Sequence, residues 1–482
     1  MGKFYVTNAI PYVNAQPHVG HALEFVQSDV IARYHKILGD DVLLLCGGDE
    51  NALKNVQAAE KAGKEVQEFV NKNTELFHEL AKKLNVHFDV WQKGSSKQHV
   101  ISSQKLWELC SANGDIYKKS YTGLYCVGCE LFYEPDELNE NGECFEHPGK
   151  KLDEVSEENY FFRLSRYNDQ IKQVLENDNL HITPVSRKNE VLTFVKQGLQ
   201  DISISRSNQR AKNWGVPVPG DDTQRMYVWF DALNIYQSGV GFGWDDELYK
   251  KWWPADVHVI GKGITKFHAL YWPAFLMSAR LPLPKSLFVH GYFTVNGQKM
   301  SKSLGNVIDP VIIVEKYGID AFRYYMLSNI PPTSDGDFSE ERLKEVYNAD
   351  LANGLGNLVS RVAKLCDNAH YSNTASDSNK NDHILNAQPY TTALTEYRFS
   401  DALAFVWNKI RDLDKYIDQE KPWDLLKKQD PRLRDVLAHA IDQIQEIARL
   451  LEPFLPETAE KITEQYTAPQ IVAKPPLFPR LV

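Results

Sequence analysis

Residues 4–33 read FYVTNAIPYVNAQPHVGHALEFVQSDVIAR, and this segment decides how the rest of the chain is interpreted. The apolar run Phe4–Val6 predicts a buried strand, and the two prolines after it predict a loop. An amphipathic helix is predicted from His18 onward, because apolar residues recur at helical spacing: Val19, Leu23, Val26 and Val30. On this pattern three polar residues are expected to turn away from the core: Glu24, Gln27 and Asp29.

Two histidines, His18 and His21, lie on the first turn of this predicted helix, beside backbone N–H groups that have no partner within the helix. Gly20 between them leaves room for a flat ring against the backbone. Such a helix start is suited to binding phosphate. An ordinary surface or core pair of histidines, or a metal site, would give the same pattern. The pattern therefore indicates a phosphate site only together with a second phosphate-binding element downstream.

The composition is that of an ordinary globular protein of 482 residues, 43% of them hydrophobic and 24% charged, which is enough for two or three domains. We expect no membrane span, which needs roughly 20 consecutive apolar residues, and no signal or transit peptide, because a strand is predicted at once. Six cysteines are too few and too clustered for a disulfide framework and favour a reducing cytoplasm. The net charge of −10 disfavours non-specific nucleic-acid binding but allows a local basic face.

A second predicted strand, Asp41–Gly48, is followed directly by Asp49. In open α/β sheets the carboxyl ends of the strands form the edge where ligands bind. Asp49 is therefore a candidate for binding a ligand cation, although it is equally suited to capping the next helix. A charged helical stretch, Ala52–Leu84, and a strand-like segment, Phe88–Trp91, come next.

The region from Ile116 to Ser156 is rich in turns, tyrosines and acidic residues and contains a set of metal-ligand types. Their spacing is C-x2-C, a gap of fourteen residues, and C-x2-H, formed by Cys126, Cys129, Cys144 and His147. Thiolates and an imidazole at this spacing suit tetrahedral zinc, and four protein ligands indicate a closed, structural site. Buried free cysteines beside a surface histidine are the alternative interpretation.

The α/β pattern resumes near Met226, and a strand at His258–Gly261 runs into a Gly-Lys-Gly turn and an aromatic-rich helix. Three residues in this part, taken singly, are ordinary core residues, but an expected position at strand ends makes them candidates for ligand contacts: Trp229, Tyr236 and His268. A hairpin is then predicted to turn at Asn296–Gly297 and to carry Lys299-Met300-Ser301-Lys302-Ser303, which we call the lysine loop. An exposed Lys-x-x-Lys is usually only a solvated loop, but one on a hairpin tip suits a phosphate clamp.

Beyond Phe338 the sequence predicts helices throughout, at Ser339–Leu365, Thr392–Asp418, Arg432–Leu451 and Pro456–Gln465. A polar spacer, Asn368–Asp382, separates the first from the rest. We expect a helix bundle appended to an α/β enzyme.

Together these features resemble the class I aminoacyl-tRNA synthetases, whose two signatures are similar to His18-Val19-Gly20-His21 and to the lysine loop. The resemblance covers essentially the whole chain and is greatest to the methionyl-tRNA synthetase family. Five further segments carry it: Ala9–Tyr12, Val228–Ala232, Phe267–Ala274, Val289–Tyr292 and Lys421–Trp423. The related synthetases for valine, isoleucine and leucine contain a large editing insertion, for which the span between the two signatures is too short.

The resemblance implies an α/β fold: a Rossmann-like class I catalytic domain with a zinc-knuckle connective insertion, followed by an all-α anticodon-binding helix bundle. The expected parts are residues 1–115 (first half of the catalytic domain), 116–225 (insertion, with the knuckle at 126–147), 226–290 (second half), 291–338 (lysine loop and linker) and 339–482 (anticodon-binding domain). The dimerisation domain of some relatives is not expected after the bundle, and this favours a monomer.

The implied function is a methionine–tRNA ligase, which converts L-methionine and ATP to methionyl-adenylate and pyrophosphate. The methionyl group then passes to the 3′-terminal adenosine of elongator and initiator tRNA(Met). The implied cofactors are one structural zinc ion and Mg²⁺ with ATP. The implied partners are ATP, L-methionine and tRNA(Met), in the cytoplasm and without a membrane.

The resemblance also assigns roles to individual residues. The catalytic residues are expected to be His18, His21, Lys299 and Lys302. ATP is expected to contact His18, Gly20, His21, Lys299, Ser301, Lys302 and Ser303. The methionine pocket, in which Asp49 binds the α-ammonium group, is expected to consist of Ala9, Ile10, Tyr12, Asp49, Trp229, Ala232, Leu233, Tyr236 and His268. The anticodon-reading positions match Asn357, Arg361 and Trp423.

Two positions depart from the family pattern. Asn51-Ala52 stands where His-Gly is usual, and Gly263 stands where an aspartate is common, so a carboxylate is missing there.

Two other functions remain as alternatives. A small-molecule nucleotidylyltransferase shares the H-x-G-H loop and the fold but needs no helix bundle. A synthetase-derived RNA-binding or regulatory protein is disfavoured by the intact histidines and lysine loop.

Overall fold

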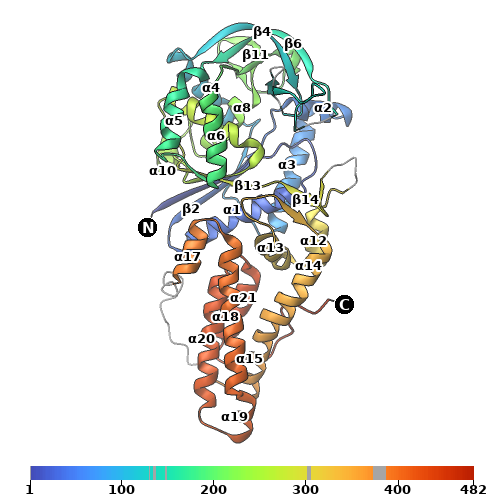
Figure 1. Ribbon diagram of the computed structural model, residues 1–482, viewed down its shortest axis with the longest axis vertical. Coiled ribbons are helices and arrows are strands. Elements are labelled where there is room, and N and C mark those ends of the chain that lie inside the picture. Colours follow the sequence, from blue (N-terminus) through green and yellow to red (C-terminus); the bar gives the residue numbers. More distant parts are fainter. Residues whose placement is uncertain are drawn as a thin grey trace.

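The computed structural model describes residues 2–129, 131–133, 137–146, 149–300, 306–372 and 387–481. A rounded α/β part forms one end of the molecule and an elongated bundle of helices forms the other (Figure 1). The central sheet of the α/β part lies near the junction, and helix α1 (Val19–Ile37) runs between the sheet and the bundle.

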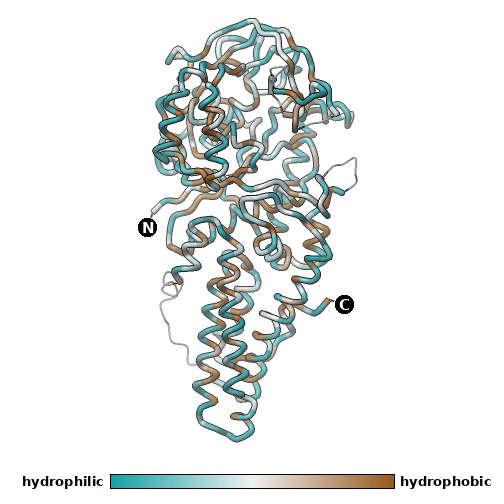
Figure 2. The backbone as a smooth tube through the Cα atoms, in the orientation of Figure 1, coloured by the Kyte–Doolittle hydropathy of each residue, from teal (hydrophilic) through white to brown (hydrophobic). Residues whose placement is uncertain are grey.

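The central sheet has six parallel strands in the order β3-β2-β1-β12-β13-β7. Their bounds are β1 (Lys3–Asn8), β2 (Asp41–Gly48), β3 (Val90–Lys93), β7 (His181–Thr183), β12 (Val257–Gly261) and β13 (Ser286–His290). The strand order changes direction between β1 and β12, where ligands bind in doubly wound sheets. Both faces of the sheet are covered, so its strands are apolar almost throughout, as the brown stretches near the middle of Figure 2 show. The predicted α/β class is confirmed.

Helices pack on both faces of this sheet. The helices of the α/β part are α1, α2 (Leu53–Lys61), α3 (Val66–Lys83), α4 (Lys97–Ala112), α5 (Asn168–Glu176), α6 (Val185–Gln197), α7 (Asn208–Ala211), α8 (Val228–Ala232), α9 (Ile235–Ser238), α10 (Asp246–Trp252) and α11 (Trp272–Ser278). The stretch Ala52–Leu84, predicted as one helical run, is two helices, because the chain turns at Gly63, where φ is +63°. A π-helical segment, Phe267–Tyr271, precedes α11.

Two small antiparallel sheets form the outer part of the α/β end (Figure 1). The first has the order β5-β4-β6-β8 and consists of β4 (Ile116–Cys126), β5 (Leu131–Tyr133), β6 (Asp153–Phe162) and β8 (Ile202–Ser203). The second has the order β10-β11-β9 and consists of β9 (Ser205–Ser207), β10 (Pro217–Val218) and β11 (Asp221–Met226).

The predicted hairpin is confirmed, with β14 (Phe293–Val295) and β15 (Gln298–Lys299) joined at Asn296 and Gly297. Both turn residues have positive φ, 49° and 73°, as a two-residue hairpin turn requires. Strand β16 (Gly336–Phe338) completes this sheet, and α12 (Pro310–Tyr317) and α13 (Ile319–Ser328) lie between β15 and β16 in the chain.

The bundle consists of α14 (Glu340–Val346), a π-helical segment (Tyr347–Gly356), α15 (Asn357–Asn368), α17 (Gln388–Thr395), α18 (Phe399–Glu420), α19 (Pro422–Lys428), α20 (Leu433–Leu451) and α21 (Pro456–Thr467). The predicted single helix Thr392–Asp418 is wrong, because the chain breaks at Tyr397, whose φ is +58°. Most of the predicted spacer Asn368–Asp382 lies outside the described residues.

Helix α1 is buried on its polar side as well, which corrects the expectation for three of its residues. Glu24, Gln27 and Asp29 are 9%, 1% and 3% exposed. The reasons are tertiary contacts: Glu24 bonds with Asn8 and His290 at the ends of β1 and β13, whereas α13 packs over Asp29. The fully buried Arg323 of α13 donates to Asp29 (2.7 Å) and to the carbonyl of Phe454 (2.7 Å), which lies between α20 and α21.

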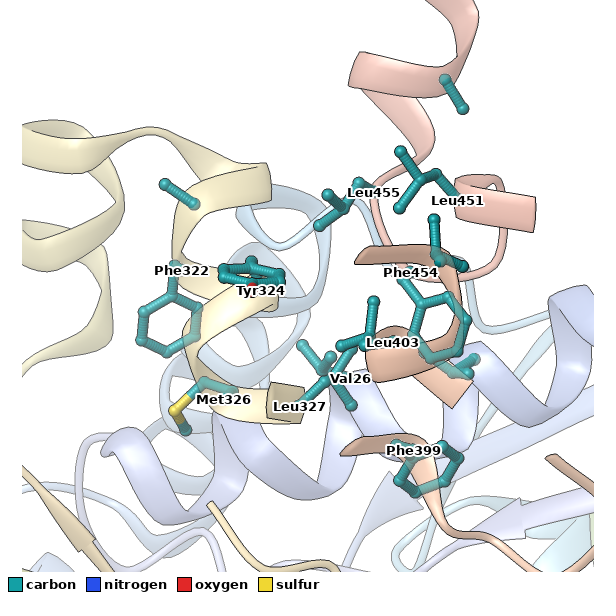
Figure 3. Packing of buried hydrophobic residues seen from close by; sticks show 14 of the residues in the cluster. Val26, Phe322, Tyr324, Met326, Leu327, Phe399, Leu403, Leu451, Phe454 and Leu455 are labelled. Atoms are coloured by element: carbon teal, nitrogen blue, oxygen red, sulfur yellow. The ribbon is translucent and has the colours of Figure 1, made fainter. Parts of the chain in front are cut away.

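Apolar packing joins the same three parts of the chain. Figure 3 shows Val26 of α1 meeting Leu327 of α13 and Leu403 of α18. The bundle is therefore continuous with the core around the central sheet, and the two ends of the molecule share one hydrophobic cluster. None of the helices in the described ranges has both the length and the apolar character needed to cross a membrane.

Candidate active site

A cavity of about 710 Å³ opens at the carboxyl ends of the central strands. Ala9 and Ile10 follow β1, Asp49 follows β2, and Gly261 ends β12, and all four line the cavity. Its position matches the switch point between β1 and β12. The carboxyl edge of the sheet thus forms the ligand site that the order of the strands predicts.

The start of α1 forms one side of this cavity through two histidines. His18 is the N-cap residue: its Nδ1 accepts from the N–H of Gly20 (3.1 Å), while Nδ1 of His21 accepts from the N–H of His18 (3.2 Å). A neutral ring whose Nδ1 accepts carries its proton on Nε2. Burial, together with His18 and His290, lowers the pKa of His21 well below its usual range, so this ring is a neutral Nε2–H donor.

Met300 of the lysine loop and Ile308 after it lie against this helix start. The Cε of Met300 is 3.7 Å from the place where a Cβ on Gly20 would lie. Beyond the loop, the carbonyl of Ile308 accepts from the N–H of Val19 (3.3 Å). The two segments that the sequence predicted to meet are therefore neighbours. Lys299 ends β15, and the predicted contacts Ser301, Lys302 and Ser303 lie outside the described residues.

All nine residues predicted for the methionine pocket line the same cavity: Ala9, Ile10, Tyr12, Asp49, Trp229, Ala232, Leu233, Tyr236 and His268. The expected position of Trp229 and Tyr236 at strand ends is wrong, since they lie on the short helices α8 and α9 after β11. Trp229 stacks on Phe267 with ring centroids 3.6 Å apart. The cavity therefore has a flat aromatic wall.

The hydroxyl of Tyr236 and Nε2 of His268 form a buried hydrogen bond of 2.8 Å. Nδ1 of His268 donates to the carbonyl of Ile264 (2.9 Å), which fixes Nε2 as the acceptor. Burial lowers the pKa of His268 to about 4, so the ring is neutral at physiological pH. This wall of the cavity carries no net charge.

Asp49, directly after β2, is held in place by hydrogen bonds of its backbone. Its N–H donates to the carbonyl of Pro11 (2.9 Å), and its own carbonyl accepts from Nδ2 of Asn55 (2.8 Å). The residue is 4% exposed and lines the cavity. A buried carboxylate at this place is suited to pairing with a ligand ammonium group.

A buried ion pair beside the histidines was missed by the sequence analysis. Oε2 of Glu24 is 2.8 Å from Nε2 of His290, and Nδ2 of Asn8 donates to Oε1 of Glu24 (2.7 Å). Burial lowers the pKa of His290, but the hydrogen bond and charge of Glu24 outweigh it, so the pKa is raised overall. The signal was present in sequence: Glu24 lies one turn after His21 on the cavity side of α1.

The predicted metal ligands Cys126, Cys129 and Cys144 come together at the end of β4. Their sulfur atoms lie within 4.8 Å of one another, with Cys144 at 3.2 Å from Cys126 and 3.7 Å from Cys129. Tetrahedral zinc with Zn–S bonds of about 2.3 Å places its sulfur ligands about 3.8 Å apart. The three thiols thus fit a metal such as zinc. The fourth predicted ligand, His147, lies outside the described residues.

Comparison with known proteins identifies the family. The family model described as tRNA synthetases class I (M) matches residues 4–363, and that of the anticodon-binding domain of tRNA ligase matches residues 387–481. The methionine–tRNA ligase of Thermotoga maritima is 42% identical over 471 residues, which cover 95% of this chain and 74% of that protein. The methionine–tRNA ligase of Brucella melitensis is 39% identical and covers 100% of this chain and 98% of that protein.

The chain belongs to the methionyl-tRNA synthetase family.

A solved structure agrees with this assignment. Methionyl-tRNA synthetase of Mycobacterium tuberculosis bound by methionyl-adenylate superposes with a TM-score of 0.91 and 37% identity, covering 99% of this chain and 100% of that one. The resemblance found in the sequence, the synthetase fold and the helical anticodon domain are confirmed.

The three residues predicted to read the anticodon lie on the bundle. Asn357 begins α15 and is exposed, and Arg361 follows one turn later. The guanidinium of Arg361 pairs with Asp414 (2.5 Å) and Asp418 (3.0 Å), near the end of α18. Trp423 is half-buried on α19, which forms the far tip of the bundle in Figure 1.

The departure at Gly263 has a local physical reason in this member of the family. A Cβ at Gly263 would lie 2.3 Å from the hydroxyl oxygen of Tyr292, so any larger residue would displace that ring. The Tyr292 hydroxyl donates to Glu146 (3.1 Å), next to the thiol cluster. Glycine at 263 is the residue that accommodates this contact between the insertion and the hairpin.

Proposed function

We propose that the chain is a methionine–tRNA ligase that activates L-methionine with ATP and transfers the methionyl group to the 3′-terminal adenosine of elongator and initiator tRNA(Met). One observation carries the proposal. All nine residues expected to bind methionine and the two histidines at the start of α1 line a single cavity. An amino acid held there lies next to a helix start suited to phosphate.

Methionine is held by both ends in this proposal. Asp49 receives the α-ammonium group, and the thioether lies among Ala9, Trp229 and Ala232 with the neutral Tyr236–His268 pair behind it. An apolar pocket discriminates by about 1–3 kcal/mol per methylene. A pocket of fixed length is therefore needed to separate methionine from its shorter and longer analogues.

The carboxylate of methionine attacks the α-phosphorus of ATP, and the bond to pyrophosphate breaks, which yields methionyl-adenylate. Nε2–H of His21 is the donor to the phosphates, and His18 and Gly20 shape the helix start beside them. Lys299, Ser301, Lys302 and Ser303 are proposed as contacts of the pyrophosphate. The protein contributes positioning and charge stabilisation rather than covalent chemistry. Mg²⁺ bound with ATP neutralises part of the phosphate charge.

The thiol cluster is proposed as one structural zinc site, with His147 as the fourth ligand of Cys126, Cys129 and Cys144. Three sulfur atoms within 4.8 Å of one another support it. Such a site stabilises the tip of the insertion, where short strands alone provide little core.

Recognition of the anticodon is proposed for Asn357, Arg361 and Trp423. Unpaired bases are bound by stacking on aromatic rings and by hydrogen bonds from arginine and amide side chains, and these three residues provide both.

The domain division proposed for the chain is the one expected from the sequence: residues 1–115, 116–225, 226–290, 291–338 and 339–482. A monomer acting in the cytoplasm is proposed as the working form.

Methionine-dependent exchange of pyrophosphate into ATP tests the first step, and charging of tRNA(Met) tests the second. Both reactions are expected with the purified chain. Exchange that depends on another amino acid contradicts the assignment, and exchange without charging leaves a small-molecule nucleotidylyltransferase. Absence of both reactions indicates an RNA-binding protein without synthetase activity.

A further inference from the structure

The side chain of Asn51 connects two walls of the cavity. Its Nδ2 donates to the carbonyl of Gly94 (2.9 Å) and to Oδ2 of Asp231 (2.6 Å). Asn51 lies two residues after Asp49 in the loop that follows β2, whereas Asp231 belongs to α8. Asp231 is 1% exposed, and a hydrogen bond to a buried carboxylate is strong.

The loop that carries Asp49 is fixed at its other contacts too. Oε1 of Glu50 accepts from the Thr74 hydroxyl (2.8 Å), and Oε2 of Glu50 accepts from the N–H of Ser95 (3.1 Å). Gly94, the other partner of Asn51, donates its N–H to the carbonyl of Gly48 at the end of β2 (3.1 Å). These hydrogen bonds therefore attach the loop to the central sheet.

The second wall is α8, a helix of five residues that carries both cavity-lining and buried side chains. Trp229 and Ala232 line the cavity, and Asp231 between them is bonded to Asn51. The buried His99 lies 3.9 Å from Asp231, but burial lowers its pKa to about 3, so it is neutral at physiological pH. The amide of Asn51 thus provides a short contact between α8 and the loop that carries Asp49.

We infer that Asn51 is a positioning residue that fixes the distance between Asp49 and the α8 wall, and thereby the length of the amino acid that the cavity accepts. The inference rests on the proposed function, in which methionine spans the same two walls, its ammonium group at Asp49 and its thioether at Trp229 and Ala232. The asparagine at this position, where the family commonly has histidine, thus has a defined structural task.

Exchange of pyrophosphate into ATP, measured with methionine and with the one-methylene-longer ethionine on full-length variants, tests the inference. Asn51→Ala is expected to lower kcat/KM for methionine about tenfold through KM, because one hydrogen bond to a buried charge is lost. The ratio of methionine to ethionine is expected to fall by about the same factor, while the KM for ATP stays within about twofold.

Asp231→Ala is expected to reproduce the effect, and Asn51→Ala with Asp231→Ala to add nothing further, because both changes remove one contact. Asp231→Asn keeps an acceptor oxygen and is expected to retain the ratio. Should Asn51→Ala fail to fold, Asn51→Ser takes its place in the same comparison. An unchanged ratio in the alanine variants, multiplied effects in the double variant, or an equal loss in Asp231→Asn overturns the inference. Failure of the proposed function is distinct, because the unaltered chain would then show no methionine-dependent exchange.

Discussion

Replacing Gly20 by alanine is expected to lower the activity of the chain while leaving its stability nearly unchanged. A Cβ at this position would lie 2.9 Å from Cε1 and 3.0 Å from Nδ1 of His18, closer than carbon atoms pack. Gly20 lies within α1, where alanine is favoured over glycine by about 1 kcal/mol, so the backbone tolerates the change. The His18 ring must therefore move, and its 3.1 Å hydrogen bond with the N–H of residue 20 is lost.

The loss in rate follows from the number of donors displaced. Removing one aligned donor from a charge-stabilising site costs on the order of 10²–10³ in kcat. Because His18 moves rather than disappears, we expect kcat for methionine-dependent pyrophosphate exchange to fall about 10²-fold. The melting temperature is expected to stay within a few degrees of that of the unaltered chain, since helix propensity and ring displacement oppose each other.

Gly354→Ala is the matched control. Gly354 also lies in a helical segment, but a Cβ there would meet its nearest neighbour at 3.6 Å, an ordinary contact. This variant is expected to exchange pyrophosphate at the normal rate. Exchange by Gly20→Ala within threefold of normal, in a folded protein, would refute the role assigned to the histidine-bearing helix start.

Four further outcomes are expected. Arg323→Met removes one of the two arginines that pair with the buried Asp29 at 2.7 Å, together with the donor to the carbonyl of Phe454, so unfolding in urea should show a loss of about 3–5 kcal/mol. Elemental analysis should find about one zinc per chain, and well under half in Cys144→Ser, whereas equal zinc in both would contradict the proposed site. Arg361→Ala should lower kcat/KM for tRNA charging at least tenfold without changing pyrophosphate exchange, and a parallel loss in exchange would argue against anticodon contact. Burial lowers the pKa of His99 from 6.5 to about 3, so the neutral ring's contribution to the free energy of unfolding is intact above pH 6.5 and is lost as the pH falls toward 3. In urea titrations between pH 6.5 and 5.5, His99→Gln should therefore lose about 1 kcal/mol less stability than the unaltered chain.

The active-site half of the structure was predictable because its signals are local. The strand at Phe4, the helix capped by His18 and the hairpin at Asn296–Gly297 each follow from a few neighbouring residues, and the structure has all three. That the helix and the lysine-loop region meet is a property of the parallel sheet, whose strand ends share one edge. That Asp49 shares a pocket with residues some 180 positions later in the chain could be predicted only through the family resemblance.

The errors occur where contacts between distant segments decide the outcome. Glu24 and Asp29 read as a solvated face, but Glu24 is buried against Asn8 and His290 at the ends of two sheet strands, and Asp29 is covered by α13, whose Arg323 is almost 300 residues away. The break at Tyr397 depends on a left-handed residue that carries no glycine signal. Trp229 was expected at a strand end, yet its strand stops at Met226 and a short helix follows. Periodicity within one segment contains no information about such partners.

A crystal structure of the chain with a non-hydrolysable methionyl-adenylate analogue tests the central claim most directly. We expect the ammonium group at Asp49, the side chain against Trp229, and the phosphate at the start of α1 within hydrogen-bond distance of His21. An analogue bound elsewhere, or bound with its phosphate turned away from α1, would contradict it.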